Sequence, residues 1–169
     1  ETYYASEIDK YAISVAQAMY PDTIQIGDVC KIDFTQYVGK VDMIIGGPPC
    51  QAYSIHGRAT DKNSMQDDYR NYLFESFVKV VAAFMPKAFI FENVTGMLSA
   101  KPGGRPVVDR IYNAFKDIGY DTLVPTCFKD AVYNAYDYNV PQHRERVILI
   151  GKRKGTGFHI EDFYEELSK

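Results

Sequence analysis

Short apolar runs alternate along this chain with longer segments of helical periodicity, and this rhythm limits the folds that the chain can adopt. The runs are typical of strands buried on both faces of a parallel sheet, and they cover residues 2–5, 23–26, 41–45, 88–91, 122–127 and 147–151. Helices are predicted at 10–19, 72–84 and 106–118, which stop before Pro21, Pro86 and Gly119. This order predicts an α/β fold with a doubly wound, mostly parallel sheet.

The length and composition fit a single domain. With 169 residues, of which 46% are hydrophobic, the chain can build one core. Its longest apolar stretch, 80–85, is too short to span a bilayer, so we expect no membrane association. The three cysteines form no CxxC pair, which predicts neither a disulfide framework nor a metal site and fits reduced thiols inside a cell.

The charge balance does not favour nucleic-acid binding through bulk electrostatics. The net charge is −3, whereas phosphate binding usually shows as a basic stripe. Local basic clusters exist, and they consist of Lys101 and Arg105 and, nearer the C-terminus, of Arg144, Arg146, Lys152, Arg153 and Lys154. A solvated face explains such clusters equally well.

Three acids and a thiol follow four of the predicted strands: Glu7, Asp28, Glu92 and Cys50. Ligands of open parallel sheets bind at the carboxyl ends of the strands, so these side chains are expected at one edge. Residues at neighbouring strand ends, about 4.8 Å apart, can bracket one planar group. Cys50 and Glu92 are such a pair, and a glutamate at an apolar strand end is where burial would help it carry or share a proton.

The residues around Cys50 favour a directed thiol over a buried filler. Pro48 and Pro49 restrict the backbone before it, and the polar segment 51–70 after it predicts a long functional loop. Cys30 and Cys127 have no such flanks and are interpreted as small buried hydrophobes. A thiol hydrolase with His56 or His143 as its base lacks an evident third, orienting residue.

Two arginines precede the last apolar run. Arg144 and Arg146 are two residues apart, so in an extended chain they project to the same side and can address one anionic or carbonyl-bearing target. The alternative is that both charges point to solvent from an exposed strand end.

Three segments together resemble the signature motifs of the cytosine C5-methyltransferases. They are Gly47-Pro48-Pro49-Cys50-Gln51-Ala52-Tyr53-Ser54, Glu92-Asn93-Val94 and Gln142-His143-Arg144-Glu145-Arg146, in the family's order. Weaker similarity to cofactor motifs lies at Ser6-Glu7-Ile8-Asp9 and Gly27-Asp28-Val29. The resemblance implies a partial catalytic domain over residues 1–169, with cofactor motifs in 1–40 and catalytic motifs in 41–152, on a Rossmann-like sheet.

The resemblance implies methylation of C5 of a cytosine rotated out of double-stranded DNA. Cys50 would attack C6, while Glu92 would hydrogen-bond N3 and the exocyclic amine. Arg146 would contact the cytosine O2, and Arg144 would support the catalytic loop or a backbone phosphate. The other residues implied on the substrate side are Gln51 and Ser54 in the closing loop, Asn93 and Val94 in the pocket, and Gln142.

The implied cofactor is S-adenosylmethionine, with no metal. Glu7 would bind the ribose hydroxyls, Ile8 would pack on the adenine, and Asp28 would accept from the adenine amino group. The remaining residues of this implied site are Val29, Pro49 and Leu73.

Measured against the family, the chain lacks the first strand with its glycine-rich cofactor loop, and the target-recognition region. In the family's sheet that strand lies between the strands that end at Glu7 and Cys50, so we expect an incomplete sheet with an apolar gap. The resemblance therefore implies missing segments or a complementing chain, and a fragment that is inactive alone. The full-length protein would be a cytoplasmic monomer, of bacterial or phage origin. Asn139 stands where the family usually has glycine, which is tolerable because asparagine enters the left-handed region readily.

Two alternatives remain open: an RNA cytosine C5-methyltransferase of the same family, and an inactive DNA-binding or scaffold fragment that keeps the fold. An amino-group methyltransferase is disfavoured, since its proline-containing motif ends in an aromatic residue where this chain has Cys50.

Overall fold

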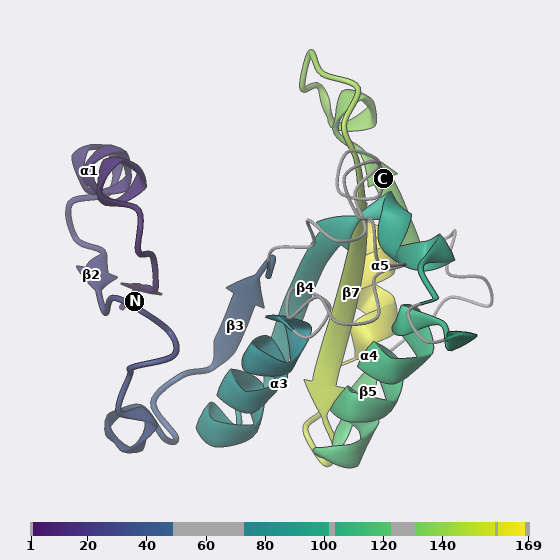
Figure 1. Ribbon diagram of the computed structural model, residues 1–169, viewed down its shortest axis with the longest axis horizontal. Helices are drawn as coiled ribbons and strands as arrows, with labels where there is room; N and C mark the ends of the chain where they lie inside the picture. Colours follow the sequence, from purple (N-terminus) through teal and green to yellow (C-terminus); the bar gives the residue numbers. More distant parts are fainter. Residues whose placement is uncertain (1, 49–72, 102–103, 123–130, 158, 168–169) are drawn as a thin grey trace.

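The computed structural model describes residues 2–48, 73–101, 104–122, 131–157 and 159–167, and a five-stranded mixed sheet is its central feature (Figure 1). The strands are β3 (Met43–Gly46), β4 (Ala88–Val94), β5 (Tyr120–Thr122), β6 (Val132–Asn134) and β7 (Glu145–Arg153). Their order is β3-β4-β7-β5, and β6 pairs with the first part of β7 while β5 pairs with its last part.

Because of the strand directions, the ends of three strands lie at one edge of this sheet. β3 and β4 are parallel, whereas β7 is antiparallel to β4, β5 and β6. The carboxyl ends of β3 and β4 therefore meet the amino end of β7, where Val94 lies opposite Arg146. The described parts of the three signature motifs, which include Gly47, Glu92 and Arg146, thus lie at this edge.

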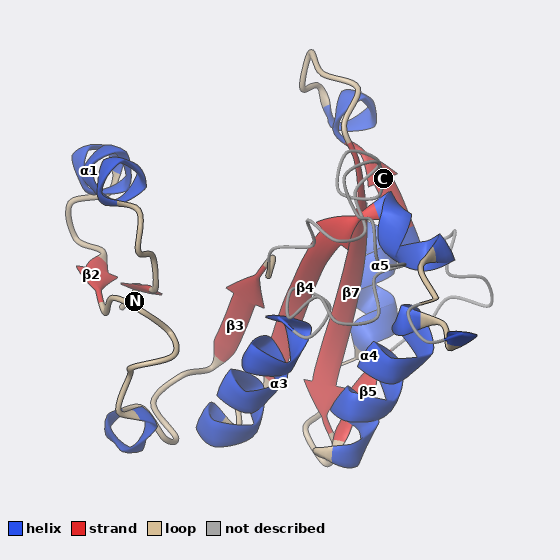
Figure 2. Cartoon of the chain, in the orientation of Figure 1, coloured by secondary structure: helices blue, strands red, loops and turns tan. Residues whose placement is uncertain are grey.

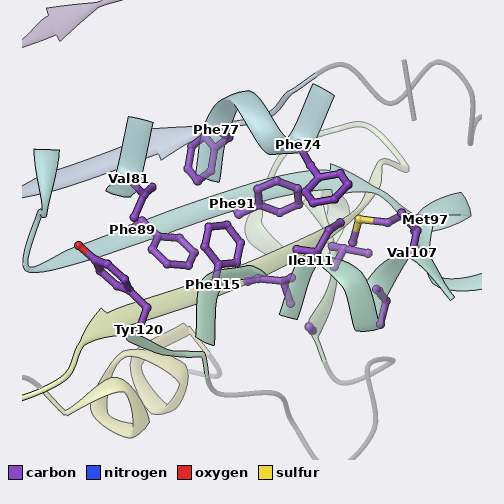
Figure 3. Packing of buried hydrophobic residues seen from close by; sticks show 14 of the residues in the cluster. Phe74, Phe77, Val81, Phe89, Phe91, Met97, Val107, Ile111, Phe115 and Tyr120 are labelled. Carbon is purple, nitrogen blue, oxygen red and sulfur yellow. The ribbon is translucent and has the colours of Figure 1, made fainter. Parts of the chain in front are cut away.

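An aromatic core joins the sheet to the two helices on one of its faces. α3 (Leu73–Phe84) and α4 (Val107–Asp117) lie in front of the sheet in Figure 2, and α5 (Ile160–Leu167) lies behind it. Phe89 of β4 stacks on Phe115 of α4 with ring centroids 4.1 Å apart, and Phe77 of α3 meets both edge-on (Figure 3). Burying each such ring contributes about 1.5–3 kcal/mol, so this cluster helps to hold β4 against the two helices.

Residues 2–25 form a smaller unit. β1 (Tyr4–Ala5) and β2 (Ile24–Gln25) are parallel partners joined by α1 (Lys10–Met19), whose first turn is capped by the carboxylate of Asp9. The 3-10 turn η1 (Phe34–Gln36) follows this unit along the chain, and its Phe34 packs edge-on against Phe84 of α3.

Among the described strands, β1 pairs only with β2, and β3 only with β4. Each therefore keeps a free edge. Apolar side chains are exposed on both sides: Ile45 of β3 is 69% exposed, and no residue of α1 is buried. This is the incomplete sheet expected from the sequence, divided between the strands that end near Glu7 and Gly47.

The predicted elements are largely present, with four differences. β4 extends through Val94, so Glu92 lies within this strand and not after it. β7 is antiparallel, which makes the sheet mixed where a mostly parallel one was predicted. β5 begins at Tyr120, ahead of the predicted run at 122–127, most of which lies outside the described residues. β6 and α5 were not predicted.

Candidate active site

An ion pair between β4 and β7 forms the centre of the candidate site. Arg146 Nε lies 2.8 Å from Glu92 Oε1, and the two side chains are 23% and 39% exposed. A second donor of the same guanidinium, Nη1, binds the carbonyl oxygen of Glu145 at 2.7 Å. The carboxylate is thus oriented by a neighbouring strand, and it is more exposed than its apolar sequence context suggested.

The chain that leaves β3 passes directly beside this carboxylate. A Cβ atom added to Gly47 would lie 2.5 Å from Glu92 Oε2, closer than real Cβ contacts. A side chain at this position would displace the Glu92 carboxylate, so glycine lets the Gly47-Pro48 backbone approach Glu92 in its present position.

Asn93, near the end of β4, forms a hydrogen bond with the Gly47-Pro48 segment. Its side chain is buried, with 3% exposure, and its Nδ2 donates to the carbonyl oxygen of Pro48 at 3.3 Å. Its Oδ1 accepts from the amide of Val94 at 2.8 Å. Both functions of the amide group are used, so Asn93 fixes where the chain leaves β3 relative to Glu92.

The two arginines border two hollows at this edge of the sheet. The polar one is lined by Thr95, Asn134, Gln142, His143, Arg144, Glu145 and Arg146. The other is largely apolar, has a volume of about 260 Å³, and is lined by Glu92, Tyr133, Ala135, Tyr138, Arg144, Arg146 and Ile148. Arg144 and Arg146 contribute to both, which agrees with their predicted projection to the same side.

Tyr133, Tyr138 and Ile148 are site residues that the sequence did not suggest. Tyr133 lies opposite Arg146 in the β6–β7 pairing, and Ile148 lies opposite Glu92. The signal for Ile148 was its spacing of two from Arg146, which places both on the same face of β7. Tyr133 had no comparable signal, because β6 was not predicted.

A second group of acids lies at the ends of β1 and β2. The hydroxyl of Ser6 donates to the carbonyl oxygen of Gly27 at 2.7 Å and joins the two strand ends. Glu7 Oε1 accepts from the amides of Ile8 and Asp9, at 2.7 and 3.0 Å. One oxygen of this carboxylate is therefore engaged by its own backbone.

Asp28 is held as an anion by its own turn. The backbone amide of Cys30 donates to Oδ1 at 2.9 Å and, together with the nearby ammonium of Lys31, lowers the pKa of the Asp28 carboxyl below its usual value. Val29 comes next and is partly buried, while Ile8 is 76% exposed beside Glu7.

The structure thus groups the expected residues into two sets. Glu92, Asn93, Val94, Gln142, Arg144 and Arg146 lie at the edge of the large sheet, and Glu7, Ile8, Asp28 and Val29 lie at the ends of the small one. Leu73 is the first residue of α3. The expected residues outside the described part of the chain are Pro49, Cys50, Gln51 and Ser54.

Membrane spans and metal centres are both absent from the described residues. None of the helices that the structure describes is both long and apolar enough to cross a membrane. Within the same residues, no group of three or more His, Cys, Asp or Glu side chains is placed to hold a metal ion.

Comparisons with known proteins agree on one family. The family model described as C-5 cytosine-specific DNA methylase matches residues 1–168. The type II methyltransferase M.Bpa9945I of Bacillus paralicheniformis is 48% identical over 126 residues, which are 73% of this chain and 28% of that protein. M.NgoPII of Neisseria gonorrhoeae, another type II methyltransferase, is 37% identical over 151 residues, which are 89% of this chain and 41% of that protein.

Solved structures show the same fold. A candidate DNA modification methyltransferase encoded within an E. coli prophage superposes with a TM-score of 0.68 and 28% identity, covering 96% of this chain and 43% of that one. The Dnmt2 methyltransferase of S. pombe superposes with a TM-score of 0.65 at 16% identity, covering 98% of this chain and 47% of that one, and supports the fold alone. In all these matches the chain spans less than half of the other protein.

Proposed function

The chain belongs to the C-5 cytosine-specific DNA methylase family, and we propose that its protein transfers a methyl group to C5 of a cytosine rotated out of duplex DNA. The observation that carries this proposal is the Glu92–Arg146 pair beside the Gly47-Pro48 backbone. That arrangement supplies a carboxylate and a guanidinium beside the backbone of Gly47 and Pro48, shortly before Cys50 in the sequence.

We propose that Cys50 is the nucleophile. A cytosine ring is too electron-poor to accept a methyl group at C5 directly. Addition of the Cys50 thiolate to C6 makes C5 nucleophilic. Glu92 gives a proton to N3 in this step, takes it back when the product is released, and accepts a hydrogen bond from the exocyclic amine. C5 then takes the methyl group. A base removes the C5 proton, the electron pair of that bond restores the ring double bond, and the thiolate leaves C6.

The pairing of Glu92 with Arg146 supports these roles. A carboxylate that is already oriented needs little rearrangement when a base enters. The Arg146 guanidinium donates to Glu92 through Nε and to Glu145 through Nη1, and we assign Nη2 to the cytosine O2. Arg144, which borders the same two hollows, is proposed to meet a backbone phosphate or the closing loop.

We propose S-adenosylmethionine as the methyl donor; when bound it supplies an activated methyl group and leaves as S-adenosylhomocysteine. The acids at the small sheet fit this ligand. Asp28, whose pKa is lowered, presents a charged acceptor suited to an adenine amino group. Glu7 has one oxygen bound to backbone amides, and its second oxygen can accept from the ribose hydroxyls. Ile8, Val29, Pro49 and Leu73 are proposed as the apolar lining.

A mechanism-based trap tests the proposed chemistry. The full-length protein is incubated with duplex DNA that contains 5-fluorocytosine and with S-adenosylmethionine labelled in its methyl group. Fluorine at C5 blocks the final elimination, so a labelled protein–DNA adduct should persist. Cys50→Ala should abolish it, while Cys30→Ala, which alters an exposed thiol near the small sheet, should keep it. A wild-type protein that gives no adduct would rule out the thiol as nucleophile.

Duplex DNA is the substrate that we propose, because the matched relatives are type II methyltransferases and the family model is one of DNA methylases. Parallel assays on duplex DNA and transfer RNA distinguish this proposal from the RNA enzyme of the same family. Methyl transfer to RNA alone would reverse the substrate assignment without affecting the roles of Cys50 and Glu92. We further propose that the full-length protein works as a monomer in the cytoplasm.

The free edges of β1 and β3 support a further part of the proposal. We propose that another strand, from a segment or chain beyond these 169 residues, lies between them and brings a glycine-rich cofactor loop. The curated relatives are more than twice as long as the matched part, and exposed Ile45 and α1 offer apolar surface for the added segment. Residues 1–169 alone should then unfold without cooperativity and transfer no methyl group. A sharp thermal transition with activity would show that no such strand is needed.

A further inference from the structure

A ten-residue loop, 135–144, connects β6 to β7 and ends at the two arginines of the site. Asn134 closes β6 and lies opposite Glu145 in the β6–β7 pairing. The loop contains the 3-10 turn η7 (Ala135–Tyr138), and Asn139 after it adopts a left-handed conformation with φ 62°. In Figure 1 this loop projects beyond the edge of the sheet.

One side-chain oxygen holds both ends of this loop. Asn134 Oδ1 accepts from the amide of Tyr136 at 3.1 Å and from the amide of Arg144 at 3.1 Å. The first amide lies at the start of the loop and the second at its end. Beside it, the amide of Ala135 donates to the carbonyl oxygen of Arg144 at 3.0 Å.

Apolar burial contributes little to the conformation of the loop. Tyr136 and Val140 are 57% and 44% exposed. The hydrogen bond from the Gln142 amide to the carbonyl oxygen of Val140 stays within the loop. The ring of Tyr136 stacks on His143 with centroids 4.5 Å apart, at an exposed position. The shared oxygen of Asn134 is therefore a main determinant of how the loop closes.

The closure of the loop by Asn134 matters because the arginines of the candidate site lie at the end of the loop and directly after it. Arg144 is the last residue of the loop, and Arg146, two residues on, carries the pair with Glu92. If the loop opened at Arg144, the first residues of β7 would lose their register with β6, and the guanidinium groups would lose their direction.

We propose that Asn134 is a positioning residue for Arg144 and Arg146, acting through its side-chain oxygen and touching no substrate itself. The effect of Asn134 on catalysis rests on the proposed function. The closure of the loop by Asn134 does not depend on that function. An aspartate at position 134 would keep an oxygen in place, whereas alanine would remove it.

The experiment uses the full-length protein with three variants: Asn134→Ala, Asn134→Asp and, as a matched control in the same loop, Asn139→Gly, which keeps the left-handed backbone. Hydrogen exchange of the Tyr136 and Arg144 amides, single-turnover methyl transfer at saturating DNA, and KM for S-adenosylmethionine are measured. For Asn134→Ala we expect the Tyr136 and Arg144 amides to exchange about tenfold faster or more, and we expect methyl transfer to slow about tenfold or more. KM for the cofactor should change less than about twofold, because Glu7 and Asp28 follow the strands of the other sheet. Asn134→Asp should restore both readouts, and Asn139→Gly should leave them unchanged.

Several outcomes would overturn the inference. Wild-type exchange or wild-type transfer rates in Asn134→Ala would do so, as would an Asn134→Asp variant as impaired as the alanine variant. If the unmodified protein transfers no methyl group to cytosine, the proposed function fails instead, and the exchange rates alone then decide whether Asn134 closes the loop.

Discussion

Arg146 on β7 places its Nε 2.8 Å from Glu92 Oε1 on β4, and so two residues far apart in sequence form one unit on neighbouring antiparallel strands. Both strands are anchored in the core, through Phe89 and Phe91 on β4 and Val147 and Leu149 on β7. The carboxylate and the guanidinium are thus held in place by the fold, which in the proposed reaction would lower the rearrangement needed when a base enters.

Removing the acid function of Glu92 should affect chemistry far more than DNA binding. In Glu92→Gln the amide keeps the shape of the side chain and can donate to N3 and accept from the exocyclic amine, but it cannot pass a proton to N3 when Cys50 adds to C6. We expect methyl transfer to slow about a hundredfold or more, with the Kd for DNA changed less than about threefold. Single-turnover rates and a binding titration measure both. Glu161→Gln, on α5 behind the sheet, is the matched control, and equal losses of rate and binding in Glu92→Gln would make Glu92 structural.

A side chain at Gly47 should displace the Glu92 carboxylate. In Gly47→Ala the new methyl group would lie 2.5 Å from Glu92 Oε2, so the carboxylate or the backbone must move. We expect methyl transfer to slow about tenfold or more, since catalytic groups displaced by about 1 Å lose much of their effect. Gly157→Ala provides the control, because a Cβ there meets nothing within 4 Å. Full activity of Gly47→Ala would show that Glu92 does not need this position.

Two buried polar side chains should respond in opposite ways to loss of their polar groups. Asn93 binds Pro48 and Val94, so Asn93→Leu strands the Pro48 carbonyl and should lower the free energy of unfolding by about 1–3 kcal/mol. Thr122 Oγ1 is buried without a partner among the described residues, so Thr122→Val should be neutral or stabilising. Urea unfolding of both variants in the full-length protein tests this contrast. A neutral Asn93→Leu would mean that the bond to Pro48 contributes nothing.

Stability should fall at alkaline pH through Tyr120. Burial raises the pKa of the Tyr120 phenol to about 12, and its hydroxyl donates to the carbonyl oxygen of Pro86 at 2.7 Å. In the unfolded chain the phenol has a pKa near its ordinary value of 10.0, so the contribution is complete below pH 10 and is lost as the pH rises towards 12. Tyr120→Phe should remove this part of the pH dependence in thermal unfolding. An identical alkaline loss in both proteins would assign it to other groups.

The sequence predicted the features that depend on local patterns. Helices ended at their breakers, as α4 does ahead of Gly119 with φ 87°, and Asn139 adopts the left-handed conformation expected for it. Glu92 was identified because strand ends collect ligand-binding groups in this class of fold. The two arginines were identified from their spacing ahead of the last apolar run, and Asn93 from the motif that it shares with Glu92.

The features that the sequence missed depend on strand direction and pairing. An apolar run such as 147–151 looks the same in a parallel and an antiparallel strand, so the reversal of β7 was not predicted. The pairing of Arg146 with Glu92 results from that reversal. The role of Tyr133 in the apolar hollow depends on β6, whose three residues are too few for a periodic pattern.

The free edges of β1 and β3 have a practical consequence for handling these 169 residues. Unpaired strand edges beside exposed apolar side chains such as Ile45 are templates for pairing with other copies, and such pairing leads to aggregation. Precipitation of the isolated chain would therefore reflect its open sheet and not a defect of the catalytic edge. Ile45→Lys should improve its solubility, whereas the same change in the full-length protein should disrupt folding if another strand covers this position.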